Sequence, residues 1–284
     1  MVLSDLDARI SELQPNTITV LGLPLDENSS FMHGPALAPT RIREVLHTGS
    51  TNLCAESGLD LATEPCWQDL GDLTLPSSMT AFTEIEQAIT QLLNRDASAL
   101  SLGGDHSVTY PILRAYAQKY PELNVLQLDA HPDLYDEWAG NRYSHACPFA
   151  RIMEEQLVAR LVQVGIRTMN PHQRRQAERF GVEVIEMRDW RPDISLDFDG
   201  PVYLSLDIDV LDPAFAPGIS HHEPGGLTTR DVLVIIQNLN APIVGADIVE
   251  FNPKRDPMGI TAMVAVKFLK EIVAQMLEKI AGGR

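Results

Sequence analysis

Imidazoles and carboxylates gather in three short clusters, and each cluster directly follows an apolar run typical of a buried strand. The clusters are G-G-D-H-S at 103–107, D-A-H-P-D at 129–133 and D-I-D at 207–209. Ligands of open parallel sheets bind beyond the carboxyl ends of the strands, so these side chains stand where chemistry usually occurs. Within a cluster the i, i+2 spacing turns side chains to one side of an extended backbone. The clusters predict one site with six candidate metal ligands: His106, Asp129, His131, Asp133, Asp207 and Asp209.

Four of these six residues are aspartates, and burying so many carboxylates without cations would be very unfavourable. Two divalent cations would balance them, since four negative charges cancel two double positive ones. Carboxylate oxygens with a few imidazoles suit Mn²⁺ better than Zn²⁺, which favours cysteine or more histidine. One such cluster alone would have a structural role, such as a helix N-cap. Three clusters at strand ends favour a binuclear metal site.

The elements that position these clusters alternate between short apolar strands and amphipathic helices, which predicts a mainly parallel sheet covered on both faces. We expect strands at 17–23, 99–102, 125–128, 161–164, 182–185, 202–208 and 243–246. We expect helices at 39–46, 82–93, 110–119, 148–157, 171–180, 228–239 and 261–280. Segment 47–80 is expected to be loop with short elements. The prediction is an α/β three-layer sandwich formed by one domain, residues 1–284.

Composition and charge exclude several classes of protein. The 284 residues are 44% hydrophobic and 21% charged, which excludes a disordered chain, a coiled coil and a collagen-like repeat. The net charge of −17, without a basic stripe, excludes a phosphate-tracking nucleic-acid binder. Three cysteines without C-x-x-C spacing indicate neither a disulfide framework nor a zinc knuckle. The acidic N-terminus lacks a secretory signal pattern and no apolar run approaches a membrane span, so we expect a soluble cytoplasmic protein.

The three clusters also resemble the metal motifs of a known enzyme family. G-G-D-H-S, D-A-H-P-D and S-L-D-I-D-V-L-D-P at 205–213 are similar to those of the ureohydrolases, which include arginases and agmatinases. The resemblance implies a binuclear manganese site and hydrolysis of a guanidino group to urea and an amine. The segments that most resemble plant-type arginases are S-S-F-M-H-G-P-A at 29–36, Y-S-H-A at 143–146, S-H-H-E-P-G-G-L at 220–227 and V-E-F-N-P at 249–253.

Carried over to this chain, the resemblance assigns each candidate residue a role. One Mn²⁺ would be held by His106, Asp129, Asp133 and Asp207. The other would be held by Asp129, His131, Asp207 and Asp209, so that Asp129 and Asp207 bridge the two ions. The residues expected to act in catalysis are Asp133, His145 and Glu250. Glu250 would pair with the guanidinium, and His145 would transfer a proton or position the substrate, although either residue alone could be structural.

The substrate is expected to be a small cationic guanidino compound, and its identity depends on the mouth of the pocket. Asn141 is the expected donor to the α-carboxylate of arginine, and the neighbouring Arg142 could add charge. His221 aligns with a hydroxyl of many relatives, so it would contact the substrate or pack against Glu250. These residues favour L-arginine, with agmatine or guanidinobutyrate as alternatives.

The remaining alternatives concern the class of protein. A catalytically silent relative would show broken metal ligands, and all six are present. A deacetylase-like hydrolase would need one zinc and fewer aspartates. The resemblance further implies a homo-oligomer, either a trimer or a hexamer.

Overall fold

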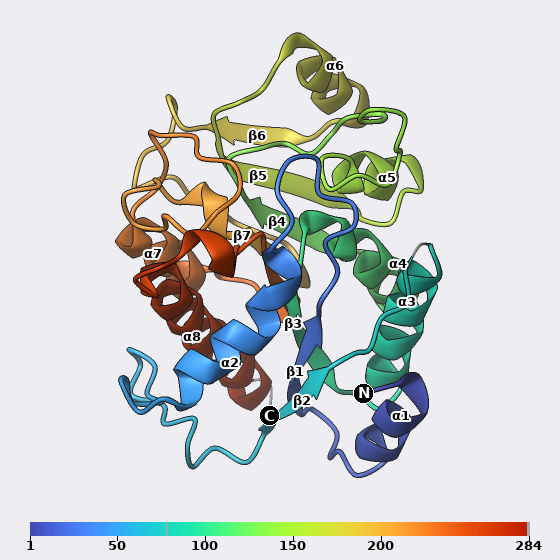
Figure 1. Ribbon diagram of the computed structural model, residues 1–284, viewed down its shortest axis with the longest axis vertical. Helices are drawn as coiled ribbons and strands as arrows, with labels where there is room; N and C mark the ends of the chain where they lie inside the picture. The colour runs from blue at the N-terminus through green and yellow to red at the C-terminus, as the bar shows by residue number, and fades with distance from the viewer. Residues whose placement is uncertain (78, 283–284) are drawn as a thin grey trace.

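One eight-stranded sheet forms the centre of the computed structural model, which describes residues 1–77 and 79–282 (Figure 1). Its strands are β1 (Ile18–Leu23), β2 (Trp67–Asp72), β3 (Ser98–Gly103), β4 (Asn124–Leu128), β5 (Arg160–Ile166), β6 (Glu183–Glu186), β7 (Val202–Asp207) and β8 (Ile243–Val249). Every strand pair is parallel, and the spatial order is β2-β1-β3-β8-β7-β4-β5-β6. The central strands are buried on both faces, as continuous apolar runs predict.

Helices cover both faces of this sheet. One face packs against α2 (Ala38–His47), α7 (Thr229–Asn238) and α8 (Ile260–Gly282) in one apolar cluster. The other face packs against α1 (Leu3–Ile10), α3 (Thr80–Leu93), α4 (Thr109–Lys119), α5 (Pro148–Glu154) and α6 (Pro171–Phe180). The predicted α/β three-layer sandwich is confirmed, and each predicted strand and helix overlaps one observed element.

Among the α-helices and strands of the described residues, α1 and β2 were not predicted as such, although β2 lies in segment 47–80, where loop with short elements was expected. In α1, Leu6 and Ile10 are buried at helical spacing, but the segment is only 8 residues long. Strand β2 lies at the edge of the sheet and is mostly half-buried, so its sequence W-Q-D-L-G-D lacks the apolar run of a central strand. Its Asp69 and Asp72 pair with Arg43 of α2.

Strand order places four strand ends side by side. Strands β3, β8, β7 and β4 are consecutive neighbours, and from β4 the chain continues to β5 on one side, whereas from β7 it continues to β8 on the other. Such a reversal of strand order between β4 and β7 opens a crevice at the carboxyl ends of the strands, where ligands bind. The three clusters singled out in the sequence follow β3, β4 and β7.

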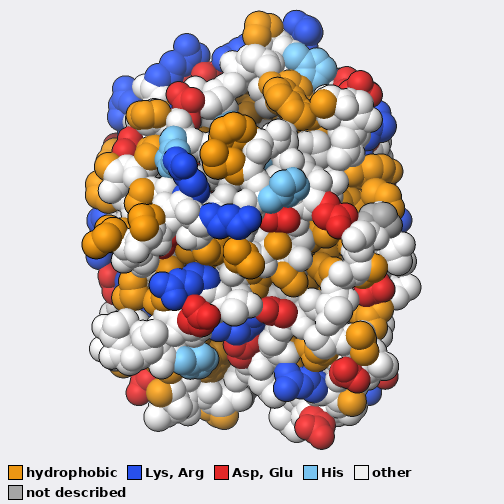
Figure 2. Space-filling view, in the orientation of Figure 1, with side chains coloured by type: hydrophobic (Ala, Val, Ile, Leu, Met, Phe, Trp, Pro, Cys, Tyr) orange, Lys and Arg blue, Asp and Glu red, His pale blue; other side chains and the backbone are white. Residues whose placement is uncertain are grey.

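The outer surface mixes side chains of every type. On the face shown in Figure 2, Lys and Arg side chains are interspersed with Asp, Glu and hydrophobic ones. Among residues 1–77 and 79–282, no helix combines the length and apolarity needed to cross a membrane.

Candidate active site

Four neighbouring strands deliver the candidate site residues to one place. His106 begins the short turn after β3, and Asp129 is the first residue after β4. Asp207 ends β7, and Glu250 follows β8 directly. All four residues are buried, with relative exposures of 5% or less. Residues far apart in sequence therefore meet because their strands are adjacent in the sheet.

The backbone of these turns is held in unusual conformations. A Cβ at Gly104 would lie 1.7 Å from the carbonyl oxygen of Leu25, so only glycine allows this close approach. The carbonyl of Gly104 accepts the N–H of Glu250 at 2.9 Å, which ties the β3 turn to the end of β8. Glu250 and Asp133 have φ angles of 63° and 49°, in the left-handed region that non-glycine residues adopt uncommonly.

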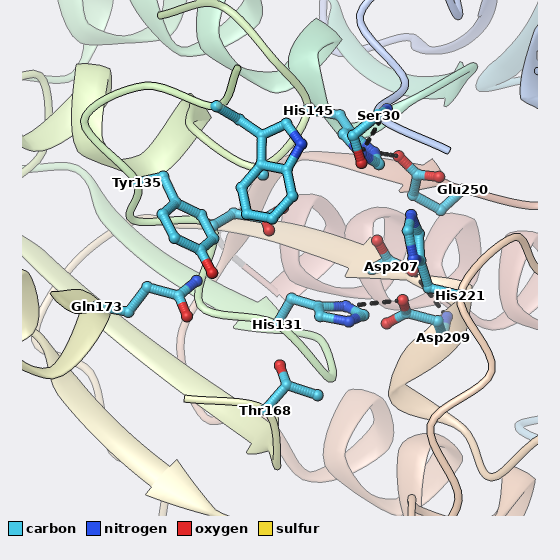
Figure 3. A pocket seen from close by; sticks show the side chains of 13 residues that line it. Ser30, His131, Tyr135, His145, Thr168, Gln173, Asp207, Asp209, His221 and Glu250 are labelled. Atoms are coloured by element: carbon cyan, nitrogen blue, oxygen red, sulfur yellow. Dashed lines mark hydrogen bonds and ion pairs between the residues drawn. The ribbon is translucent and has the colours of Figure 1, made fainter. Parts of the chain in front are cut away.

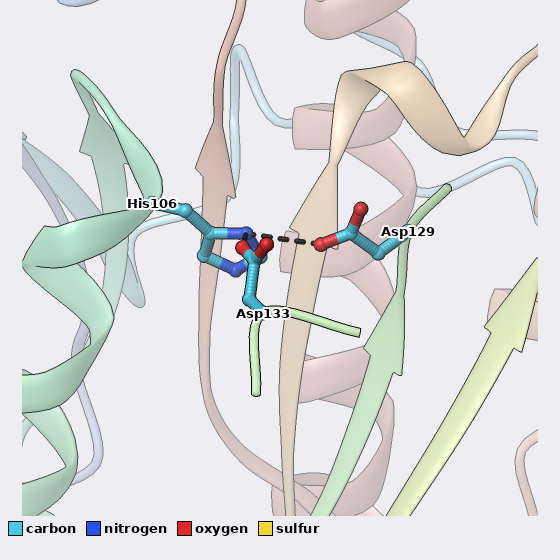
Figure 4. Close-up of side chains that lie close together, drawn as sticks. All are labelled: His106, Asp129 and Asp133. Atoms are coloured by element: carbon cyan, nitrogen blue, oxygen red, sulfur yellow. Dashed lines mark ion pairs between the residues drawn. The ribbon is translucent and has the colours of Figure 1, made fainter. Parts of the chain in front are cut away.

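His106, Asp129 and Asp133 form the first group of side chains (Figure 4). The Nδ1 of His106 lies 3.1 Å from Oδ2 of Asp129 and 3.1 Å from Oδ2 of Asp133. Asp207 approaches the same nitrogen from β7, with its Oδ2 at 3.3 Å. Its other oxygen, Oδ1, accepts the N–H of Asp209 at 2.7 Å.

Asp129, His131 and Asp209 form the second group. The Nδ1 of His131 lies 2.9 Å from Oδ2 of Asp209 and 3.5 Å from Oδ1 of Asp129. The His131 side chain lines a pocket (Figure 3) and is 26% exposed, whereas the carboxylates of Asp209 and Asp129 are nearly fully buried. Asp129 belongs to both groups, which together hold five of the six predicted residues, and Asp207 joins them through its contact with His106.

The cluster contains several buried carboxylates close together, and their mutual repulsion and burial disfavour the charged form. Burial and the charges of Asp209 and Asp129 raise the pKa of Asp207 well above its ordinary range. Burial and the charge of Asp129 raise the pKa of Asp133 to about 6. Burial would lower the pKa of His106, but the surrounding carboxylates raise it well above its usual value. Cations among these side chains would relieve the repulsion.

The donor atoms fit divalent cations. The Nδ1 of His106 is buried and forms no hydrogen bond with any described residue, although two carboxylate oxygens lie 3.1 Å away. Buried polar atoms are normally satisfied, so an unpaired nitrogen facing carboxylate oxygens marks a place for a cation. Carboxylates and imidazoles in this ratio are ligands that Mn²⁺ accepts.

Buried polar side chains of the sheet contact two of the candidate metal ligands, His106 and Asp129. Ser205 on β7 lies with its Oγ 2.9 Å from Nε2 of His106 and donates to Asp247 on β8 at 2.8 Å. Gln127 on β4 donates to Oδ2 of Asp129 at 2.7 Å. Such contacts fix the orientation of ligands and raise their affinity for metals. Their sequence signal is a polar residue inside an apolar strand two positions before a ligand, as at Ser205 and Gln127.

Glu250 and His145 form a pair beside the cluster. Oε1 of Glu250 accepts the N–H of His106 at 2.8 Å and lies 2.8 Å from Nδ1 of His145. The backbone N–H of Ser30, which can only donate, faces Nε2 of His145 at 3.0 Å. The ring proton therefore lies on Nδ1, towards Glu250. Burial lowers the pKa of His145, but Glu250 outweighs it and raises this pKa above its ordinary value.

His221 occupies the space between these groups. Its ring lies 5.5 Å from that of His145, 5.7 Å from that of His131 and 5.5 Å from that of Phe31, between ring centroids. Its Nε2 is buried and has no hydrogen-bond partner among the described residues. Burial and the nearby His145 lower the pKa of His221, so its imidazole is neutral near pH 7.

These side chains surround one pocket (Figure 3). Its lining comprises Ser30, His131, Asp133, Tyr135, Trp138, His145, Ala146, Thr168, Gln173, Asp207, Asp209, His221 and Glu250. Sequence reasoning missed Ser30, Tyr135, Trp138, Thr168 and Gln173, which are themselves neutral and lie in loops or at a helix start.

Asn141, the expected donor to a substrate carboxylate, is not part of this lining. Its Nδ2 donates to Asn28 at 3.2 Å and its Oδ1 accepts the N–H of Tyr143 at 2.8 Å. Arg142 forms an ion pair with Glu154 at 2.9 Å. Both side chains are therefore engaged in holding the loop 138–146 rather than facing the pocket.

Known proteins share this sequence and this fold. Arginase 1, mitochondrial, of Arabidopsis thaliana is 46% identical over 275 residues, which cover 91% of this chain and 80% of that protein. An agmatinase of Bacillus cereus is 34% identical over 271 residues, 92% of each chain. The structure of arginase from Medicago truncatula superposes with a TM-score of 0.87 at 42% identity, covering 96% of this chain and 91% of that one.

These relatives correct one expectation. Similar plant arginases are named mitochondrial or chloroplastic/mitochondrial, which contradicts the cytoplasmic location expected from the sequence. The inference rested on the lack of a secretory signal pattern, and that pattern carries no information about organelles reached by other routes.

The resemblance seen in the three motifs is confirmed along most of the chain. The model of the arginase family matches residues 16–274, a range that includes every strand of the sheet and every residue of the cluster. With the relatives and the shared fold, this match shows that the chain belongs to the arginase family.

Proposed function

We propose that residues 1–284 form one ureohydrolase domain that hydrolyses L-arginine to L-ornithine and urea. The observation that carries the proposal is the cluster of two ligand groups sharing Asp129, with Glu250, His145 and His221 beside it in one pocket. The similarity to plant arginases supports arginine as the substrate. A catalytically silent relative would have no reason to keep this unbalanced charge buried.

Two Mn²⁺ ions would be held by the six residues named from the sequence. His106, Asp133 and Asp209 would each bind one ion, as would His131, while Asp129 and Asp207 bridge. When bound, such a pair of ions lowers the pKa of a shared water molecule and so makes it nucleophilic near neutral pH.

Glu250 is placed to hold the guanidinium. Its Oε1 is engaged by His106 and His145, and no described residue hydrogen-bonds to its Oε2. A free carboxylate oxygen in a buried pocket favours a cationic hydrogen-bond donor, because hydrogen bonds between charged groups are stronger than those between neutral groups. The neutral His221 beside it offers an unpaired ring nitrogen to the same guanidinium.

His145 is placed to handle the proton of the reaction. Hydrolysis forms a C–O bond between water and the guanidinium carbon and breaks one C–N bond. The leaving amine must then receive a proton. His145 lines the pocket with a proton on Nδ1, and Ser30 fixes its ring. We therefore assign it to position the substrate and to return a proton to the amine.

Agmatine is the second candidate substrate, and guanidinobutyrate the third. The absence of Lys and Arg from the pocket lining favours agmatine, because no described basic side chain there meets a carboxylate. Urea release from arginine, agmatine and guanidinobutyrate, measured on Mn²⁺-loaded enzyme, distinguishes them. Urea from none of the three would refute the proposed function, and metal analysis would check for two ions per chain.

We also propose that the enzyme assembles as a homo-oligomer, a trimer or hexamer. Exposed apolar residues at the start of α8 support an interface: Met258 is 80% exposed and Ile260 is 49% exposed. Sedimentation velocity of the purified protein tests this, and a monomer at micromolar concentration would refute it.

A further inference from the structure

One wall of the pocket takes no part in the guanidinium chemistry proposed above. It is formed by Tyr135 from the loop after β4, Thr168 from the loop after β5 and Gln173 from the first turn of α6. Figure 3 shows Tyr135 and Gln173 on the same side of the pocket, across it from Glu250 and His145. Gln173 is only 3% exposed, so a helical amide is buried against the cavity.

The N-terminus of α6 fixes the orientation of Gln173. Asn170 and Gln173 form a capping box, in which Oδ1 of Asn170 accepts the N–H of Gln173 at 3.0 Å. In return, Oε1 of Gln173 accepts the N–H of Asn170 at 3.4 Å. Because the cap uses the amide oxygen, the amide nitrogen of Gln173 is the free end. It donates to none of the described residues.

The same cap fixes the proton of Tyr135. The Oδ1 of Asn170 serves the cap, so its Nδ2 points outwards and donates to the Tyr135 hydroxyl at 2.6 Å. The hydroxyl is an acceptor in this bond, so its own proton remains available. The Tyr135 ring is held between His172, stacked at 5.6 Å, and Trp138 at 4.9 Å between centroids. Two donors, one amide and one hydroxyl, are therefore left without acceptors on one wall, as far as the described residues show.

The surroundings favour a negative ligand at these donors. They lie at the N-terminus of a helix of 10 residues, whose dipole favours negative charge. Thr168, the third residue of the wall, donates its hydroxyl proton to the carbonyl of Ala130 at 3.1 Å. The carboxylate nearest in the lining, Asp133, belongs to the metal cluster and would be neutralised by it.

We propose that Gln173 and Tyr135 bind the α-carboxylate of a guanidino amino acid and so make the enzyme select arginine over agmatine. The inference rests on the proposed function, since it assumes that the guanidinium end is held at Glu250. It replaces Asn141, which faces away from the pocket, as the donor that an arginine enzyme needs. A site built to hydrogen-bond one substrate group rejects the analogue that lacks it.

Two substitutions remove the donors while keeping the fold. Gln173→Glu retains an oxygen for the Asn170 N–H but replaces the donor with a negative charge. Tyr135→Phe removes the hydroxyl and keeps the stacked ring. Arg175→Gln, at an exposed position of the same helix, is the control because it lowers the charge of α6 by the same single unit as Gln173→Glu.

The measurement is the ratio of kcat/KM for arginine to that for agmatine, together with inhibition by ornithine and by putrescine. Loss of a hydrogen bond to a charged group predicts that each variant lowers the ratio about tenfold or more, through KM for arginine. Ornithine inhibition weakens by a similar factor relative to putrescine, and the control leaves both ratios unchanged. Melting temperatures identify a misfolded Gln173→Glu, in which case Tyr135→Phe decides.

Unchanged ratios in folded variants would overturn the inference. Failure of the proposed function looks different, because the unmodified enzyme would then release no urea from arginine. Binding of ornithine still tests the two donors in that case, since it needs no turnover.

Discussion

The floor and the far wall of the pocket are built from different kinds of sequence. The floor consists of ionisable residues at the ends of β3, β4 and β7, which the sheet brings together. The far wall consists of Tyr135, Trp138, Thr168 and Gln173, neutral residues in loops and at the start of α6. Under the proposed function the floor would provide the hydrolytic chemistry, and under the further inference the wall would contact the α-carboxylate that arginine has and agmatine lacks. The two proposals together assign reactivity and selectivity to separate parts of the structure.

Removing a floor ligand is expected to have the largest effect. His131→Ala takes one donor from the second group, so activity on every guanidino substrate should fall below detection and bound metal should drop from two ions towards one. The side chain is 26% exposed and lies after a strand, so the melting temperature of the metal-free protein should barely change. Metal analysis, urea release and thermal melting check this. His47→Ala, at an exposed position of α2, is the control.

The two regions also differ in how far the sequence predicts them. The residues of the floor were named from the sequence, because three clusters of Asp and His after apolar runs together favour a cation site, although one cluster alone would have a structural role. The wall was not predicted. Gln173 has the sequence signature of an N-cap partner, and its proposed role as a donor to the substrate depends on which atom of its amide is engaged in the cap. Asn141 was chosen for its nearness to His145 in sequence, but in the fold its amide binds Asn28 and Tyr143.

The fold shows the same division. Central strands such as β1 and β4 were predicted because burial on both faces demands an unbroken apolar run. The edge strand β2 was missed because its exposed side tolerates charge, and Asp69 there serves an ion pair with Arg43. Burial thus makes a segment predictable from its sequence. Loops and edge strands stay partly exposed, so many different sequences can form them.

A substitution beside the floor, across the pocket from the wall, should act on all substrates alike. Glu250→Gln keeps the shape of the side chain but removes the charge that binds the guanidinium. Because hydrogen bonds to charged groups contribute about 1.5–3 kcal/mol, kcat/KM should fall at least about tenfold for both arginine and agmatine. Metal content should remain at two ions. A variant with normal turnover would make Glu250 a structural residue that only fixes the β3 turn.

A substitution of a residue that hydrogen-bonds to a metal ligand of the floor should weaken metal binding. Its effect on turnover at saturating metal should be smaller. Ser205→Ala removes the hydroxyl between His106 and Asp247. Loss of such an orienting contact typically lowers metal affinity about 10–100-fold. Titration of the metal-free protein with Mn²⁺, followed by urea release, measures the shift. If activity at high Mn²⁺ recovers, the hydroxyl orients the ligand. If affinity is unchanged, the Asp247 network serves only the packing of β7 against β8.

The smallest effect is expected at His221, which lies between the two regions. His221→Thr restores the hydroxyl that many relatives carry and removes a neutral imidazole, whose single hydrogen bond contributes about 0.5–1.5 kcal/mol. We therefore expect kcat/KM to fall only severalfold, by similar factors for arginine and agmatine, because the ring faces the guanidinium common to both. Parallel kinetics on the two substrates check this. If kcat/KM fell for arginine alone, His221 would belong to the wall. The same imidazole would then contribute to both reactivity and selectivity.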